Sequence, residues 1–514
     1  MNTKHLLTAM AFVAIPVAAQ ETYQDAKLAE KDLNGTARYV GMGGAMEALG
    51  ADISTISTNP AGLGLFRSSQ LSASGGLVSQ PNAKTTLSYE GIDANFNGNK
   101  TNMSFDQIGF VWVNRSHGKN FINLGFNYHK SRNFDQILSA VGPLTNASQN
   151  KLTAIKFPFA TETSWNGVDA NYETLMSKSM DGQQMDYYNG HAFAFGQYQK
   201  GYIGEYDVNV SGNIKDRVYL GLTLGLHDVN YRSSSYYTEN LEQNTMAESW
   251  ESLQIDGSGF DIKAGVIFRP IAASPFRIGV YVNSPVFYDL RLRGANDVTL
   301  TNSANAKGDS GQEASYDFRL NTPWKFGISL GHTVSNYLAL GATYEFADYG
   351  STDNRIINGG YYDPWSGGYY DTSSSDEAMN AHTKATLKGV HTLKLGAEYK
   401  PTSAWAIRLG YNFVSPMFRE QGFRDGSIDS PGNAYATSTD YTNWKSTNRI
   451  TAGLGYATGK FNIDLAYQYS QTNGEFFPFM NFSGGADHAL DNVVSQTNVS
   501  DNRHQVLLTV GYRF

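Results

Sequence analysis

The segment Val218-Tyr-Leu-Gly-Leu-Thr-Leu-Gly-Leu226 alternates between large apolar residues and small or polar ones. Successive side chains of a β-strand point to opposite faces, so the valine and leucines share one face, and the glycines and threonine share the other. Such a strand is typical of a transmembrane β-barrel, in which the apolar face meets lipid and the other face lines the lumen. The segment therefore predicts an all-β membrane protein.

The same alternation recurs along the chain, for example at 338–346, 393–399, 405–413 and 461–469. It predicts a transmembrane antiparallel β-barrel of about fourteen strands. The predicted strands are 70–79, 104–114, 120–131, 204–212, 217–234, 249–269, 276–293, 315–331, 337–349, 385–400, 404–415, 442–457, 460–471 and 501–514.

The connections between these strands alternate between short turns and long loops. The short turns are 115–119, 213–216, 270–275, 332–336, 401–403 and 458–459, and the long loops include 80–103, 132–203, 350–384, 416–441 and 472–500. Barrels of bacterial outer membranes have short periplasmic turns and long extracellular loops. The last strand is amphipathic and ends on Phe514, which resembles the signal read by the barrel-assembly machinery, an expected partner.

Composition narrows the functional classes. The chain has no cysteine, and its ten histidines show no paired metal-ligand spacing, so we expect no disulfide, no metal site and no cofactor. A net charge of -8 argues against a nucleic acid partner. Residues 1–19 have the charged start, apolar run and small residues of a secretory signal peptide, which directs the chain out of the cytoplasm.

A glycine-rich stretch, 35–67, precedes the first predicted strand and contains Asn59-Pro60-Ala61-Gly62-Leu63. Asn59 is a good helix N-cap, and Pro60 suits the first helical position, so the motif predicts a capped single turn. The stretch resembles the N-terminal hatch of the FadL family of outer-membrane transporters for long-chain fatty acids and other hydrophobic molecules. We therefore expect a signal peptide at 1–19, a hatch that plugs the lumen at 20–68 and the barrel at 69–514.

The resemblance implies transport of a hydrophobic small molecule across the bacterial outer membrane, past a movable hatch. Asn59, Pro60, Ala61 and Gly62 are the expected gating motif. Barrels of that family also have a kink in the third strand that opens a lateral exit, for which Gly125 is a candidate here. Two alternatives remain open, namely a shuttle or interaction protein of a secretion system and haem-related uptake.

The loop at 132–203 is unusually apolar. Its spacing predicts two short amphipathic helices, one at Phe134, Ile137 and Leu138 and one around Tyr172. We expect either a core internal to the loop or a groove that captures an apolar ligand. The candidate capture residues are Phe134, Ile137, Leu138, Phe157, Phe159, Met180 and Phe193.

Alternation also places charged and amide side chains in the lumen. They are Asp261, Lys263, Lys325, Glu345, Lys394, Glu398, Arg408, Asn412, Asp464 and Gln468. Both signs are present, which favours a neutralised network that braces the barrel. A lysine or arginine among them, such as Lys263, Lys325 or Arg408, is a second option as partner for a ligand carboxylate.

Enzymatic activity is not expected. Residues 327–331 match the pattern of a nucleophile elbow, but they lie within an alternating strand, whereas that motif needs a strand-to-helix turn. The expected partners are a hydrophobic ligand, outer-membrane lipid and the assembly machinery.

Overall fold

The computed structural model describes residues 21–114, 120–301, 307–484 and 488–514. The predicted signal peptide and the predicted turn at 115–119 lie outside the described residues. In the described ranges, no helix combines the length and the apolar composition needed to cross a membrane.

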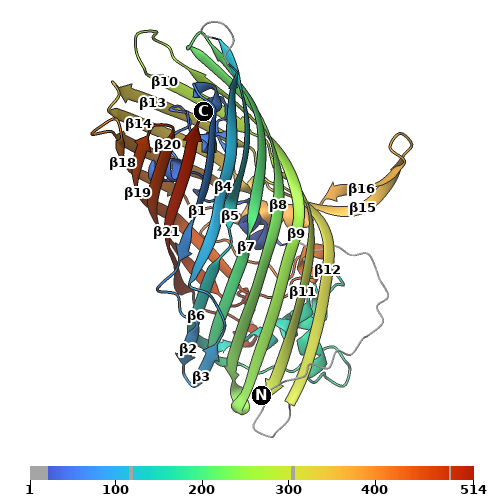
Figure 1. Ribbon diagram of the computed structural model, residues 1–514. Coiled ribbons are helices and arrows are strands. Elements are labelled where there is room, and N and C mark those ends of the chain that lie inside the picture. The colour runs from blue at the N-terminus through green and yellow to red at the C-terminus, as the bar shows by residue number, and fades with distance from the viewer. Residues whose placement is uncertain (1–20, 115–119, 302–306, 485–487) are drawn as a thin grey trace.

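Fourteen antiparallel strands close into a barrel (Figure 1), which confirms the predicted fold. Closure is made by the last strand, which pairs with the first from Gln70↔Arg513 to Ser79↔His504. In order around the wall the strands are β1 (Gln70–Ser79), β4 (Thr101–Asn114), β5 (Phe121–Asn133), β7 (Gly190–Ile214), β8 (Val218–Leu241), β9 (Thr245–Phe268), β10 (Arg277–Asn283), β13 (Lys325–Val334), β14 (Leu338–Asp348), β17 (Gly389–Tyr399), β18 (Trp405–Val414), β19 (Tyr441–Thr458), β20 (Phe461–Phe477) and β21 (Thr497–Arg513).

Several strands continue beyond this closed part at the end that carries the long loops, here termed the long-loop end. β10 is continued by β11 (Phe287–Thr301), β12 (Lys307–Asn321) precedes β13, and β7, β8 and β9 stay paired over more than twenty residues. The segment 190–203 was predicted as loop, but it is the first half of β7. It carries apolar and polar residues on both faces, so the alternation that marks a lipid-facing strand is missing.

The two faces of the wall follow the predicted alternation. Leu220, Leu222, Leu224 and Leu226 are exposed on the outside. Of the ten residues predicted to face the lumen, nine are buried and Lys325 is half-buried. The barrel therefore has an apolar exterior and a polar, charged interior.

The N-terminal segment lies inside the barrel (Figure 1, dark blue) and forms α1 (Thr22–Ala29), α2 (Ala37–Gly41), η1 (Ile53–Ser57) and η2 (Pro60–Leu65). Residues 21–66 are here termed the hatch. The predicted capped turn is confirmed, because the Asn59 side chain accepts a hydrogen bond from Ala61 N at 3.2 Å, at the start of η2.

The long-loop end carries the remaining elements, most of which fold over the mouth of the barrel. They are β2 (Thr86–Tyr89), β3 (Ile92–Asn95), β6 (Gln136–Ala147), α3 (Gln149–Lys156), η3 (Phe157–Phe159), α4 (Gly167–Leu175), η4 (Glu242–Asn244), η5 (Tyr349–Ser351), β15 (Asp353–Asp363), β16 (Gly368–Ser375), α5 (Glu377–Thr386), α6 (Pro431–Ala434) and η6 (His488–Leu490).

Of the two helices predicted in the loop 132–203, only the one around Tyr172 exists, as α4. The prediction at Phe134, Ile137 and Leu138 is wrong, because Ile137 and Leu138 belong to β6, which pairs with β7. Both faces of β6 are covered there, so Ile137 and Leu138 are buried although they are adjacent. A strand buried on both faces loses the alternation by which strands are recognised.

Candidate functional site

A cavity of about 250 Å³ lies in the lumen between the hatch and the elements of the long-loop end. The hatch contributes α1 and the segment that follows it, and the wall contributes the inner faces of many strands. Loop residues such as Met417 and Phe418 close the remaining side. The cavity is thus enclosed by three parts of the chain that are far apart in sequence.

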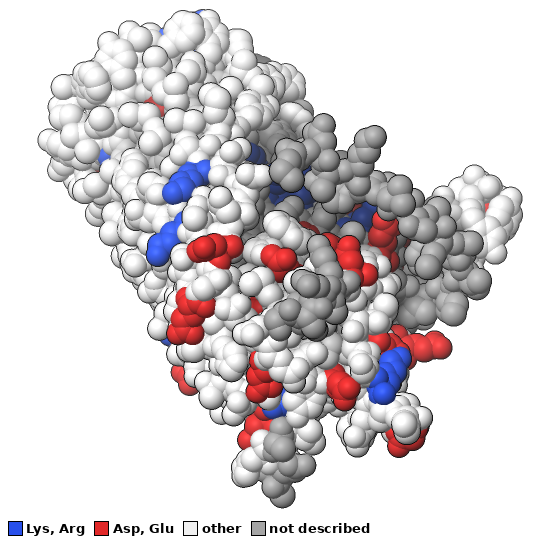
Figure 2. All heavy atoms as spheres, turned by 90° about the horizontal axis from the view of Figure 1, so that it is seen from below, with Lys and Arg blue, Asp and Glu red and all other residues white. Residues whose placement is uncertain are grey.

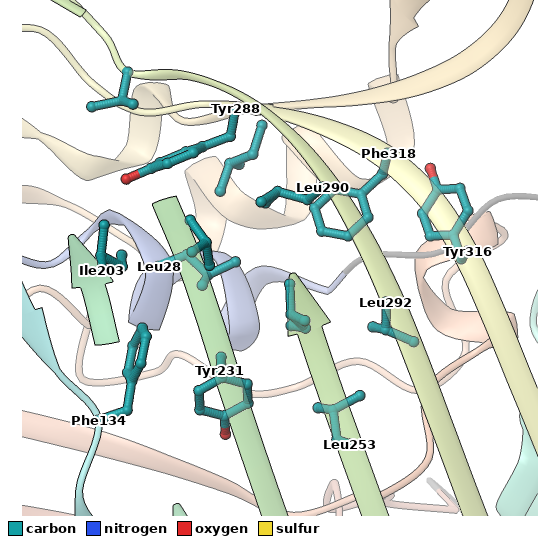
Figure 3. Close-up of a cluster of buried hydrophobic side chains, with 14 residues drawn as sticks. Leu28, Phe134, Ile203, Tyr231, Leu253, Tyr288, Leu290, Leu292, Tyr316 and Phe318 are labelled. Carbon is teal, nitrogen blue, oxygen red and sulfur yellow. The ribbon is translucent and has the colours of Figure 1, made fainter. Parts of the chain in front are cut away.

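One wall of the cavity is apolar (Figure 3). Leu28 of the hatch packs there with Phe134, Ile203 and Tyr288 of the barrel, within a larger buried cluster. The Phe134 ring meets the Tyr231 ring edge to face, with centroids 4.9 Å apart. This wall offers a ligand aromatic and branched aliphatic surface, the usual lining of a pocket for apolar small molecules.

Helix α1 is attached to the long-loop end. The Tyr23 ring stacks on Phe418 with centroids 5.0 Å apart, and its hydroxyl donates to Asn443 Oδ1 at 2.7 Å. The Thr22 hydroxyl lies 2.9 Å from the Thr383 hydroxyl of α5. Because of these contacts, a movement of the loops would also displace α1 of the hatch.

The Asn59–Pro60 turn sits against a part of the wall made of glycines. An added Cβ at Gly265 of β9 would lie 2.0 Å from Asn59 Oδ1, and one at Gly221 of β8 would lie 2.3 Å from the Pro60 carbonyl carbon. The Asn59 amide also donates to the Glu47 carbonyl at 3.1 Å, which joins two segments of the hatch. Only glycine allows this close approach of hatch and wall.

Ion pairs hold the rest of the hatch. Glu47, fully buried, accepts from Lys394 Nζ at 2.8 Å and from the Thr343 hydroxyl at 2.7 Å. Arg38 pairs with Glu398 at 2.9 Å, and Lys31 pairs with Glu205 at 2.9 Å. Charged groups of the lumen thus bind the hatch as well as one another.

The cations singled out in the sequence are already engaged. Lys263 Nζ lies within 3.0 Å of three carboxylates, those of Glu205, Asp207 and Asp261. Arg408 lies between Glu398 and Asp464, at 2.7 Å from each. Lys325 pairs with Glu345 at 3.4 Å. These contacts support the bracing network.

Sequence reasoning missed Arg449 of β19, which lines the cavity. It is only 9 % exposed, and it donates to Asn412 Oδ1 at 2.9 Å. Among the described residues, no carboxylate oxygen lies within 4.0 Å of it. Alternation along β19 places Arg449 on the lumen face with Thr451, so its position could have been predicted. Alternation does not show whether a cation on that face has a carboxylate next to it.

Four carboxyl groups that line the cavity lie outside the barrel strands, namely those of Glu21, Glu30, Asp32 and Asp440. Burial, together with nearby Glu251, raises the pKa of Asp440 to about 6. Burial would also raise the pKa of Asp32 in the hatch, but the guanidinium groups around it, first Arg132 at 2.9 Å, hold that pKa below its usual range. Near neutral pH the Asp32 carboxyl is therefore ionised, whereas the Asp440 carboxyl gains a proton in mildly acid solution.

The wall of the barrel is interrupted beside the cavity. Pairing of β5 with β4 ends at Gln107↔His129, and among the described residues no strand pairs with the first part of β4 on this side. The pairing of β5 with β7 is irregular at Ser131, and the strand stops at Asn133.

The hatch takes the place of the missing strand. Asp32 N donates to the Ser131 carbonyl at 2.8 Å, and the Asn34 amide donates to Asp106 Oδ1 at 2.9 Å. The expected kink at Gly125 is wrong, since Gly125 is regularly paired with Val111 and Asn209. Its missing Cβ instead leaves room for Leu63 of the hatch.

The candidate capture residues do not form one surface. Phe134 and Leu138 line the cavity, whereas Ile137 and Phe193 are buried elsewhere. Phe157 is half-buried against the cluster around Tyr172, and Phe159 and Met180 are exposed. Much of the loop's apolar content therefore forms cores within the long-loop end.

The chain was compared with known proteins. No protein-family model matches it, and no curated protein matches it in sequence. Among solved structures it is similar to a Pseudomonas aeruginosa FadL homologue, with a TM-score of 0.51 and 13% identity over 94% of this chain and 99% of that one. The Ralstonia pickettii toluene transporter TbuX matches at a TM-score of 0.49 and 13% identity, over 94% and 99% of the two chains. At these identities the likeness is one of fold.

Proposed function

We propose that this protein is a FadL-type channel of the bacterial outer membrane that takes up hydrophobic molecules with an anionic head group, such as long-chain fatty acids. The sequence of the hatch and the fold of the FadL homologue support the type of protein. The contents of the cavity support the class of ligand.

Membrane placement follows from the exterior of the barrel. Outward residues of β8 are apolar from Leu220 to Leu226, and the next outward residue, Asp228, is charged. On β14 the outward residues run from Leu340 to Phe346 before Asp348. A continuous apolar band of this kind in water would be unfavourable, whereas lipid covers it.

The single observation that carries the ligand class is Arg449 beside the apolar wall. No carboxylate oxygen of the described residues lies within 4.0 Å of this buried guanidinium, so Asp32 and Glu30 compensate its charge only from a longer distance, and its lost hydration is replaced only in part. An entering carboxylate would supply a direct anionic partner and bind through charge-assisted hydrogen bonds, while its chain packs on Leu28 and Phe134.

The outer charge of the protein does not supply this attraction. Viewed from the long-loop end, acidic side chains are spread over the surface with few basic ones among them (Figure 2). An anionic ligand would thus gain no attraction from the mouth, and its selection would rest on apolar contacts and on Arg449.

Passage requires the hatch to move. Its α1 is attached to the loops, and its residues Asp32 and Asn34 fill the gap beside β4. We infer that ligand entry displaces this segment and opens the gap as a lateral exit, while Asn59, Pro60, Ala61 and Gly62 keep the rest of the hatch in place against the glycine recess.

The test is uptake and binding by the full barrel. The purified protein is extracted and its bound molecules are identified by mass spectrometry, and uptake of isotope-labelled hexadecanoic acid is measured in cells with and without the protein. We expect an enriched long-chain acid and protein-dependent uptake. Co-purification of a protein partner or of haem, with no enriched acid and no uptake, would refute the proposal.

A further inference from the structure

One hairpin departs from the barrel and carries an unusual surface. Strands β15 and β16 pair with each other from Arg355↔Ser375 to Asp363↔Gly368. Strand pairing joins the hairpin to the wall only at its base, through Asp353–Ile356 and β12, and beyond the base Arg319 of β12 donates to the Asp371 carbonyl at 3.2 Å. From Ile357 onward the hairpin projects sideways, away from the barrel wall (Figure 1).

The outer half of this hairpin is aromatic on both faces. Tyr361 pairs with Tyr370 on one face, and Tyr362 pairs with Tyr369 on the other. All four are exposed, and Trp365 at the turn is 98 % exposed. Residues 358–371 contain no lysine or arginine. A surface of this kind on both sides of a projecting element indicates contact with something outside the chain.

Hydrogen bonds within the turn fix its conformation and leave the Trp365 side chain exposed. The Asp363 carboxylate accepts from Trp365 N and from the Ser366 hydroxyl, each at 2.9 Å. Gly367 has a φ of +68°, a conformation that suits glycine. A two-stranded hairpin is at best marginally stable by itself in water, which again favours an external partner.

The level at which the hairpin leaves the wall identifies that partner. On β14 the exterior changes from apolar Phe346 to charged Asp348, and β15 begins five residues later. On the neighbouring strands, exposed Trp324 lies within three residues of Asn321, where the pairing with β15 begins. The hairpin therefore starts at the boundary of the apolar band.

We propose that the β15–β16 hairpin lies in the headgroup region of the lipid leaflet that surrounds the long-loop end, with Trp365 and Tyr369 in contact with lipid. Tyrosine and tryptophan concentrate at membrane–water interfaces, because their rings are apolar and their polar atoms remain hydrated. This inference rests on the membrane placement proposed above. The hairpin carries aromatic side chains outward from the barrel at the membrane–water interface. It would thereby fix the depth and the tilt of the barrel in the membrane.

The absence of native cysteine makes the test direct. Trp365→Cys and Tyr369→Cys are each spin-labelled in the full-length barrel and reconstituted in phosphatidylcholine–phosphatidylglycerol vesicles. Leu222→Cys in the apolar band and Met180→Cys in an exposed loop are the lipid and water references. Accessibility to oxygen, which concentrates in lipid, is compared with accessibility to a water-soluble nickel chelate.

We expect both hairpin labels to be several-fold less accessible to the nickel chelate than the Met180 label, and more accessible to it than the Leu222 label. If the hairpin labels are as accessible to the nickel chelate as the Met180 label, while the Leu222 label is in lipid, the hairpin proposal is refuted and the membrane placement stands. A Leu222 label in water would refute the membrane placement. Spin–spin broadening that disappears on dilution with unlabelled protein would show a second copy on the hairpin and overturn the proposal. The second hairpin variant covers the case in which one fails to fold.

Discussion

Replacement of Arg449 by glutamine tests the proposed ligand class most directly. Glutamine can keep the hydrogen bond to Asn412 and removes the charge. A hydrogen bond to a charged group contributes about 1.5–3 kcal/mol, so the affinity for a long-chain acid should fall roughly 10- to 100-fold. The fold should lose little stability, because no carboxylate oxygen of the described residues lies within 4.0 Å of the buried guanidinium, and Arg132 remains paired with Asp32.

The assay is displacement of a fluorescent fatty acid from the purified barrel by hexadecanoic acid and by its methyl ester. The ester has the same chain and no charge, so Arg449→Gln should leave its affinity unchanged. Arg291→Gln, on the outer wall and paired with Asp317, is the matched control and should alter neither ligand. Equal losses for acid and ester, or no loss for the acid, would refute the role of Arg449.

Three further changes test the hatch and the cavity. Gly265→Val should push the Asn59 turn away from the wall and raise the conductance of small solutes in planar bilayers. The control Gly212→Ala should not raise it, because a Cβ added at Gly212 meets open space. Equal conductance of the two variants would contradict the close packing of the turn against the glycines. Asn59→Ala should destabilise the hatch by about 0.5–2 kcal/mol through the lost cap, measured as earlier hydrogen exchange at Ala61, and unchanged exchange would argue against a cap. Because Asp440 is protonated below its pKa of about 6, an alkyl sulfonate, which does not titrate, should bind about two- to tenfold more tightly at pH 5 than at pH 7.5. Asp440→Asn should remove this pH dependence, and its persistence would assign the titration to another group.

The fold was predictable because a lipid-facing barrel imposes its pattern locally. Each of the fourteen closed strands overlaps a predicted one, since lipid on one side and lumen on the other produce alternation that can be read within ten residues. Where that constraint ends, prediction failed. The first half of β7 and the strand β6 lie beyond the apolar band and are covered on both faces. Their sequence therefore predicts a loop, with a short helix at Phe134, Ile137 and Leu138, instead of strands.

The site was only partly predictable. The capped turn at Asn59 follows from local chemistry, and the charged residues of the lumen follow from alternation. The pairing of those charges does not, because it joins residues such as Glu47 and Lys394 that are far apart in sequence. The sequence therefore predicts a neutralised network but does not show which carboxylates engage Lys263 and Arg408.

The barrel, its inner and outer faces and the segment that fills it can be predicted from the order of residues, since each depends on neighbouring residues and on the solvent that they meet. Three features become visible only in three dimensions: Arg449 has no carboxylate oxygen of the described residues within 4.0 Å, the hatch fills the gap beside β4, and the tyrosines of β15 and β16 project from the wall. Those features depend on which distant groups come within a few ångströms of one another, and no local pattern specifies such contacts.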